Sequence, residues 1–155
     1  MEGMEDAMKK ILLACVALFA AALLFGQAKS TGLTDSDVQA FCKNFKKIES
    51  DFRNYDVDLS DAQALAYALD ADTAAAKVLN KNGISGANAV DKVKAIAYGY
   101  VIARFEEEMA ADPEAAKMLK ALGQDPLAEV RGKVSDADQK VAARYTQELK
   151  KVFEN

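Results

Sequence analysis

Apolar residues recur at helical spacing along most of the chain beyond residue 30, and this pattern predicts an all-α fold. The first such segment steps by three or four residues and so shares one helix face: Val38, Phe41, Phe45, Ile48, Phe52 and Tyr55. Thr34 precedes it as a suitable N-cap, and Asp35 and Asp37 suit the positive first turn. We therefore expect a first helix that begins after Thr34 and packs on a core through this face.

Two more helices are predicted in the middle of the chain. Ser60 and Gln63 have the spacing of a capping box, so a second helix is expected from there to about Asn80, ended by Asn82 and Gly83. A third helix is expected from about Ala89 to Ala111, and its centre is apolar on nearly all sides, which is typical of a helix surrounded by others. Gly99 in this centre lets a neighbouring helix, or alternatively a ligand, approach the backbone.

Two Asp-Pro pairs predict the remaining helix starts, with aspartate as N-cap and proline at the first helical position. Asp112-Pro113 opens a short helix that ends near Leu122, and Asp125-Pro126 opens a segment whose apolar residues recur almost in heptads as far as Val152. Gly132 and Ser135-Asp136 can divide this last segment, so one helix and two helices both remain open. The predicted architecture is an antiparallel helical bundle of about four longer helices and one short helix.

The first 28 residues have the layout of a secretory signal peptide. Fifteen uninterrupted apolar residues, 11–25, follow Lys9 and Lys10 and precede the small residues around Gln27. This run is shorter than the ~20 apolar residues that a membrane-spanning helix needs. We expect cleavage after Ala28, which leaves a single helical domain of residues 29–155 in the periplasm or outside the cell.

Other interpretations of this N-terminal region stay open. An uncleaved run of residues 11–25 would anchor the protein in a membrane, Cys15 lies in a weak match to a lipoprotein box, and the run can also be a buried helix of the domain. The acidic residues before Met8 are unusual ahead of a signal peptide, so Met8 is an alternative start to Met1. Only the membrane-anchored forms would involve a lipid partner.

Charge and cysteine content narrow the classes of partner. Residues 29–155 carry a net charge of about −3 (18 basic against 21 acidic residues) and no basic stripe interleaved with aromatics, so nucleic-acid binding is not expected. Cys42 is the one cysteine of this region, which excludes an intramolecular disulfide. We interpret it as a half-buried packing residue with a free thiol, and an intermolecular disulfide is the alternative.

Recognised catalytic and metal-binding patterns are missing from the sequence. The chain has no histidine, which removes the commonest general base and transition-metal ligand. The acidic stretch 56–61 begins like a calcium loop but has Asp61 where the loop needs glycine and Tyr67 where it needs glutamate. No nucleophile elbow and no phosphate-binding glycine loop is present. We therefore predict a protein without catalytic activity, cofactor or metal.

Tyr98, Tyr100 and Arg104 form the one grouping that suggests ligand or partner contact. Tyr100 and Arg104 lie one turn apart on the most apolar helix, which suits a carboxylate or phosphate head group above an apolar pocket. The plainer alternative places both tyrosines in the core and pairs Arg104 with Glu107 or Glu108.

Two functions follow as hypotheses. The first is an exported, non-catalytic helical protein that acts through protein contacts, either with a second copy of itself or with a cell-envelope protein, because the apolar stripes at 38–55 and 127–152 can pack within one chain or between two. The second is a carrier of a small apolar or amphipathic ligand in a pocket lined by Tyr98, Tyr100, Val101, Ile102 and Phe105.

Overall fold

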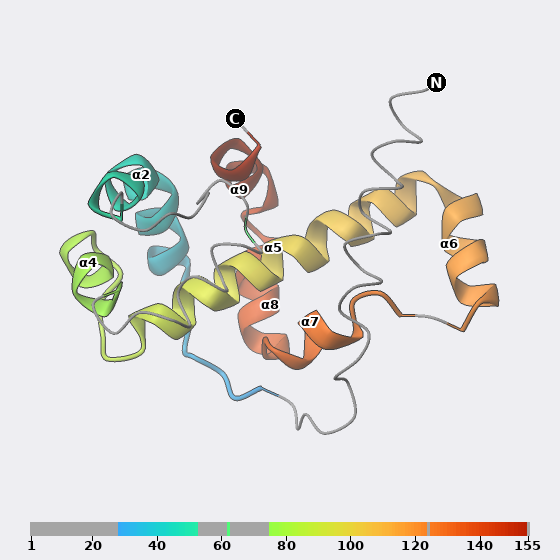
Figure 1. Cartoon of the computed structure of the whole chain (residues 1–155), viewed down its shortest axis with the longest axis horizontal. Coiled ribbons are helices and arrows are strands. Elements are labelled where there is room, and N and C mark those ends of the chain that lie inside the picture. The colour runs from blue at the N-terminus through green and yellow to red at the C-terminus, as the bar shows by residue number, and fades with distance from the viewer. Residues whose placement is uncertain (1–27, 53–61, 63–74, 124, 155) are drawn as a thin grey trace.

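The computed structural model describes residues 28–52, 62, 75–123 and 125–154, and every regular element within them is an α-helix. The predicted all-α class is therefore confirmed for this part of the chain. Figure 1 shows the helices in order. Their bounds are α2 Asp35–Asp51, α4 Ala75–Lys81, α5 Ala89–Ala111, α6 Pro113–Ala121, α7 Ala128–Gly132, α8 Asp136–Ala143 and α9 Thr146–Phe153.

Helix α2 begins where its sequence predicts. The Thr34 hydroxyl accepts a hydrogen bond from the Asp37 backbone N–H, and the Asp37 carboxylate accepts one from the Thr34 N–H, which together form a capping box. The predicted apolar face is buried along the helix at Val38, Phe41, Phe45 and Ile48. The predicted continuation to Tyr55 and most of the predicted second helix lie outside the described residues. Within the predicted range of that helix the structure describes α4, which stops before Asn82 and Gly83 as expected, with Gly83 at a φ of +91° that favours glycine.

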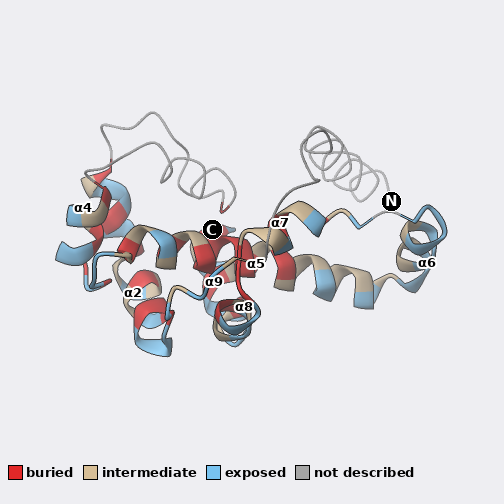
Figure 2. Cartoon of the chain, turned by 90° about the horizontal axis from the view of Figure 1, so that it is seen from below, coloured by how far each residue is buried: buried red, intermediate tan, exposed pale blue. Residues whose placement is uncertain are grey.

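Helix α5 is the central element, and the other described helices lie along it or at its ends (Figures 1 and 2). Its bounds match the predicted third helix, and its residues 95–100 are buried on all sides. A Cβ atom added at Gly99 would lie 2.6 Å from the Cβ of Ala142 in α8. Gly99 therefore serves close packing of α8 on α5, which decides between the two interpretations of this glycine.

The two Asp-Pro pairs behave differently. Asp112 caps α6 as predicted, because its carboxylate accepts a hydrogen bond from the Ala115 N–H and Pro113 is the first helical residue. The prediction for Asp125-Pro126 is wrong by two residues, since the Asp125 carboxylate accepts from the Leu127 N–H in a turn and α7 starts only at Ala128.

The segment after Pro126 forms three short helices, α7, α8 and α9, so both the one-helix and the two-helix predictions are wrong. Ser135 ends the continuity after α7, because its hydroxyl accepts from the Asp138 N–H and caps α8. A further break at Arg144 and Tyr145 separates α8 from α9. In the described residues only α2 and α5, with 17 and 23 residues, are long helices.

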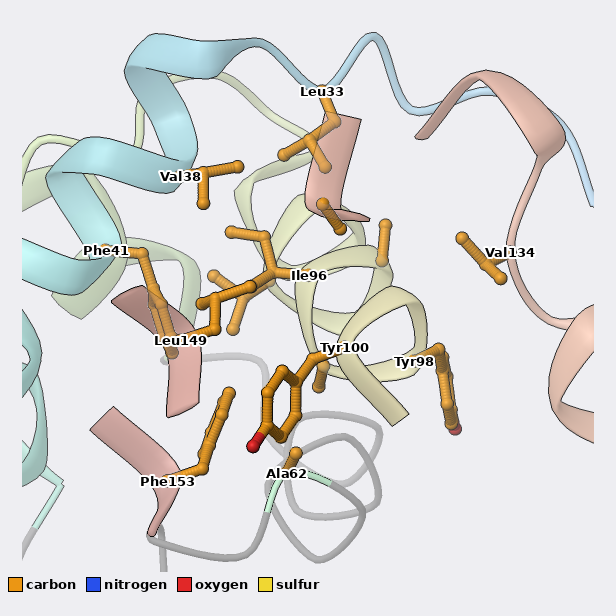
Figure 3. Packing of buried hydrophobic residues seen from close by; sticks show 14 of the residues in the cluster. Leu33, Val38, Phe41, Ala62, Ile96, Tyr98, Tyr100, Val134, Leu149 and Phe153 are labelled. Carbon is orange, nitrogen blue, oxygen red and sulfur yellow. The ribbon is translucent and has the colours of Figure 1, made fainter. Parts of the chain in front are cut away.

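The core gathers apolar side chains from α2, α5, α8 and α9, and Figure 3 shows Phe41 of α2, Ile96 of α5 and Leu149 of α9 among them. Phe153 of α9 packs on Phe41, Phe45 and Tyr100 with ring centroids 5.1–5.9 Å apart. The apolar stripes at 38–55 and 127–152 were expected to pack within one chain or between two. Where they are described, most of their residues are buried inside this chain. The exceptions are Val141, Tyr145 and Val152, which are half-buried, and Ala137, which is exposed. Among the described helices, none has the length and apolar character to cross a membrane.

Candidate functional site

The predicted grouping of Tyr98, Tyr100 and Arg104 is only partly brought together by the fold. Tyr98 and Tyr100 leave different sides of α5 (Figure 3), and both are buried. The Tyr98 ring lies beneath the Lys133 ammonium, whose nitrogen is 5.7 Å from the ring centroid. Tyr98 therefore does not share a site with Arg104.

Tyr100 and Arg104 do converge, and the group between them is a carboxylate of the same chain. The Tyr100 hydroxyl donates to Glu154 Oε1 at 2.5 Å, and Arg104 Nε donates to the same oxygen at 2.9 Å. The other Arg104 nitrogens reach Glu107 at 3.0 Å and Glu108 at 3.3 Å. The arrangement expected to bind an external head group is thus filled by the residue that follows α9.

The pKa shifts of Tyr100 and Glu154 favour an ionised Glu154 carboxylate that is held in place by hydrogen bonds. Burial raises the pKa of the Tyr100 hydroxyl, and its hydrogen bond to Glu154 raises it further. Partial burial alone would raise the pKa of Glu154, but the hydrogen bonds from Tyr100 and Arg104 outweigh burial and leave that pKa lowered. Glu154 is therefore ionised at neutral pH, and Tyr100 is a neutral donor to it.

An open groove of about 850 Å³ lies between α2 and α9, at a place that sequence reasoning did not predict. Its apolar lining comes from Cys42, Phe45 and Val152. Polar side chains form the remaining wall, with three lysines against two glutamates: Gln39, Lys43, Lys46, Glu49, Tyr145, Glu148 and Lys151. Its volume falls in the range of small-ligand sites.

Cys42 borders this groove and is half-buried, as its position on the helix predicts. Burial raises the pKa of its thiol to about 11, and the nearby Glu148 carboxylate adds to the increase. Because the thiolate is the reactive form, Cys42 is a poor nucleophile at neutral pH. The groove is therefore better suited to binding than to thiol chemistry.

Helix α6 shows the clearest unsatisfied apolar surface among the described residues. None of its residues is buried. Met118 within the helix is 66% exposed, and Leu122, the residue directly after the helix, is 62% exposed. Figure 1 shows α6 at the end of α5 that lies farthest from α2 and α4. A smaller hollow of about 390 Å³ separates α6 from the chain around Pro126, and Phe105 and Leu119 help to line it.

The buried Asp138 carboxylate joins residues 30–33 to the first turn of α8. Asp138 is 1% exposed and accepts hydrogen bonds from Ser30 Oγ at 3.1 Å and from the Thr31 and Leu33 N–H groups at 2.7 and 3.2 Å. The Ser135 hydroxyl donates a fourth at 2.8 Å. Burial by itself would raise the pKa of Asp138, but these bonds lower it overall. The Ser135-to-Asp138 spacing was a signal for the helix cap, although no local signal pointed to residues 30–33.

The acidic clusters give no metal centre in the part of the chain that the structure describes, where no three carboxylate or thiol groups gather in a ligand arrangement. The calcium-like stretch 56–61 falls outside the described residues. No protein-family model, no curated protein sequence and no solved structure matches the chain. The candidate site is therefore identified only from the geometry and chemistry of this chain's own residues.

Proposed function

We propose that the chain is an exported, non-catalytic protein whose helices form an antiparallel bundle behind a cleaved signal peptide, and that it acts by associating with further copies of itself. The contact would place α6 of one copy in the groove between α2 and α9 of the next. The observation that carries this proposal is the exposure of Met118 and Leu122 on a helix without any buried residue.

Shape and length support this pairing. Glu114, Met118 and Leu122 are four residues apart and form one ridge on α6. Eight residues of helix span about 12 Å, and the α2 wall of the groove, from Gln39 to Glu49, spans about 15 Å at 1.5 Å per residue. The ridge can therefore lie along the groove, with its apolar side chains against Phe45 and Val152 of the apolar lining.

Charge supports the same pairing. The ridge carries the Glu114 carboxylate, and the groove carries three lysines against two glutamates. Lys43 and Lys46 make no ion pair with any described residue, so both ammonium groups are available to an incoming carboxylate. Because ridge and groove lie on different parts of one molecule, the contact is head-to-tail and builds rings or open chains rather than closed two-fold dimers.

Sedimentation velocity over a concentration series tests the proposal. We expect the mature protein to form species larger than a monomer, Met118→Lys to be monomeric, and Glu114→Lys and Lys46→Glu to weaken association singly. Combining Glu114→Lys with Lys46→Glu in one chain restores the opposite charges and should restore association. Lys140→Glu, an equal change of charge at an exposed position of α8, is the matched control and should leave association unchanged.

A protein that is monomeric at every concentration would contradict self-association. So would a double charge reversal that behaves like the sum of its single changes, because the two charges would then not meet.

A second function is favoured by the groove itself. Its apolar lining and lysine-rich wall also suit an amphipathic anion, so we propose a carrier of such a ligand as the alternative, with the site moved from Tyr98, Tyr100 and Arg104 to the groove. Native mass spectrometry of protein recovered from its own host separates the two functions. A mass excess of a few hundred daltons that disappears on denaturation and in Lys43→Glu would identify a carrier, whereas oligomers without excess mass would support self-association.

A further inference from the structure

The segment 30–33 is an integral strap of the folded domain. Four hydrogen bonds join Asp138 to its surroundings, and three of them come from this strap, more than 100 residues away in sequence. The Asn88 side chain adds a further bond, because its Nδ2 donates to the Thr31 carbonyl. The start of the domain is thus fixed between α5 and the first turn of α8.

Among the described residues two carboxylates are buried, Asp37 and Asp138, and they differ because Asp138 has no counter-charge. Asp37 holds the same position in the capping box of α2 and is paired with Lys92, whose Nζ lies 3.1 Å away. No lysine or arginine of the described chain pairs with Asp138, which is held by neutral donors alone. A buried carboxylate without a cation bears a desolvation cost that a nearby positive charge would reduce.

The predicted cleavage creates such a charge next to the strap. Hydrolysis of the Ala28–Lys29 peptide bond by a signal peptidase adds one water, leaves the carboxylate on Ala28 and frees the Lys29 nitrogen, which takes up a proton and becomes an α-ammonium group. This nitrogen stands two residues before the Thr31 N–H that contacts Asp138. Two residues of extended chain and that hydrogen bond limit the separation to about 10 Å, within the range of electrostatic interaction in dilute salt.

We propose that leader removal completes the fold, because the new α-ammonium group of Lys29 acts as the counter-charge of Asp138. This inference rests on the proposed export and cleavage. It assigns a role to the new N-terminus itself: the processed chain is more stable than one in which the amine is absent or displaced.

Titration of the α-amine in the mature protein tests the pairing without any variant. Reductive methylation with ¹³C-formaldehyde followed by NMR resolves each amine, and the α-amine pKa is expected about half a unit above its usual 7.7–8.0. In Asp138→Asn this increase should vanish. An α-amine with its ordinary pKa in the mature protein without any substitution would overturn the proposal.

A thermodynamic cycle gives a second measurement, which would show no effect if the role of Asp138 were only structural. Insertion of Gly-Ser between Ala28 and Lys29 shifts the amine away and changes nothing in the strap. We expect this insertion to lower the melting temperature in the Asp138 background and to have no effect in Asp138→Asn, with the difference shrinking at high salt. Equal effects in both backgrounds would contradict the pairing. If Asp138→Asn does not fold, the α-amine pKa of the Gly-Ser insertion variant takes its place. The insertion should return that pKa to its ordinary range, and an unchanged pKa would contradict the pairing.

The mass of the protein recovered from its host separates this inference from the export it rests on. A retained leader would refute the cleavage and with it the pairing. An N-terminus at Lys29 together with an ordinary α-amine pKa would leave export standing and refute the pairing alone.

Discussion

The contact of α5 with α8 at Gly99 gives a prediction whose size follows from the structure. In Gly99→Ala the new methyl carbon would stand 2.6 Å from the Cβ of Ala142, whereas ordinary contacts lie at 3.4–4 Å. The two helices must therefore separate by about 1 Å, and overpacking of this kind costs about 1–3 kcal/mol. Alanine is also the better helix former by about 1 kcal/mol, so the net loss of unfolding free energy is expected at about 0–2 kcal/mol.

The partner substitution isolates the steric part. Ala142→Gly removes the methyl group that the new side chain meets, and alone it should cost about 2 kcal/mol from lost burial and lost helix propensity. In the double variant Gly99→Ala with Ala142→Gly the methyl group moves from one helix to the other, so we expect it to be about 1–3 kcal/mol more stable than the sum of the single effects. Urea unfolding followed by circular dichroism measures all four proteins. Additivity within about 0.5 kcal/mol would refute the close helix contact.

Three further predictions concern the ionisable groups. The folded-state pKa of Asp138 is below the ordinary 3.8, so its stabilising effect is present above that value and is lost as the pH falls below it. Urea unfolding at a series of pH values from 7 to 2 should show this loss of unfolding free energy, and Asp138→Asn should make the unfolding free energy depend less on pH. Cys42 should react slowly with iodoacetamide at pH 7 and faster as the pH approaches 11, and Glu148→Gln should raise its rate at fixed pH by removing a charge that disfavours the thiolate. Tyr100→Phe should cost about 1 kcal/mol of unfolding free energy and speed amide hydrogen exchange in the last turn of α9, because Glu154 loses a donor.

Local signals were sufficient for the helices whose ends are set by neighbouring residues. The N-cap of α2 at Thr34 and the end of α5 before Asp112-Pro113 follow from neighbouring residues, and the structure has them where the sequence predicts. The same Asp-Pro signal gave the correct start at Asp112 and a start two residues early at Asp125. At Asp125 the carboxylate is shared between the Leu127 N–H and the Arg131 guanidinium, and this favours a turn before the helix.

The near-heptad pattern after Pro126 led to a wrong number of helices, because apolar spacing indicates which residues are buried and not whether the helix between them is continuous. Leu127, Val134 and Leu149 are buried as the pattern requires, yet Leu127 precedes α7, Val134 lies between α7 and α8, and only Leu149 is inside a helix, α9. The chain turns at Ser135 because its hydroxyl caps α8, and the carboxylate of Asp138 in the first turn of α8 binds a strap more than 100 residues away. Sequence spacing carries no information about a partner at that distance, so the break could be suspected but not decided.

The Tyr100 and Arg104 pair shows how far chemistry can be predicted without tertiary structure. Their spacing on one helix face suits a carboxylate or phosphate head group, and in the structure the Glu154 carboxylate of the same chain occupies this place. The spacing could not show that Glu154 supplies it, because that depends on how α9 returns to α5. The interaction that suited an external ligand instead fixes the C-terminal helix on the core, and α9 forms one wall of the groove. A loss of this interaction should therefore disturb the association that we propose for the groove, even though neither Tyr100 nor Arg104 lines it.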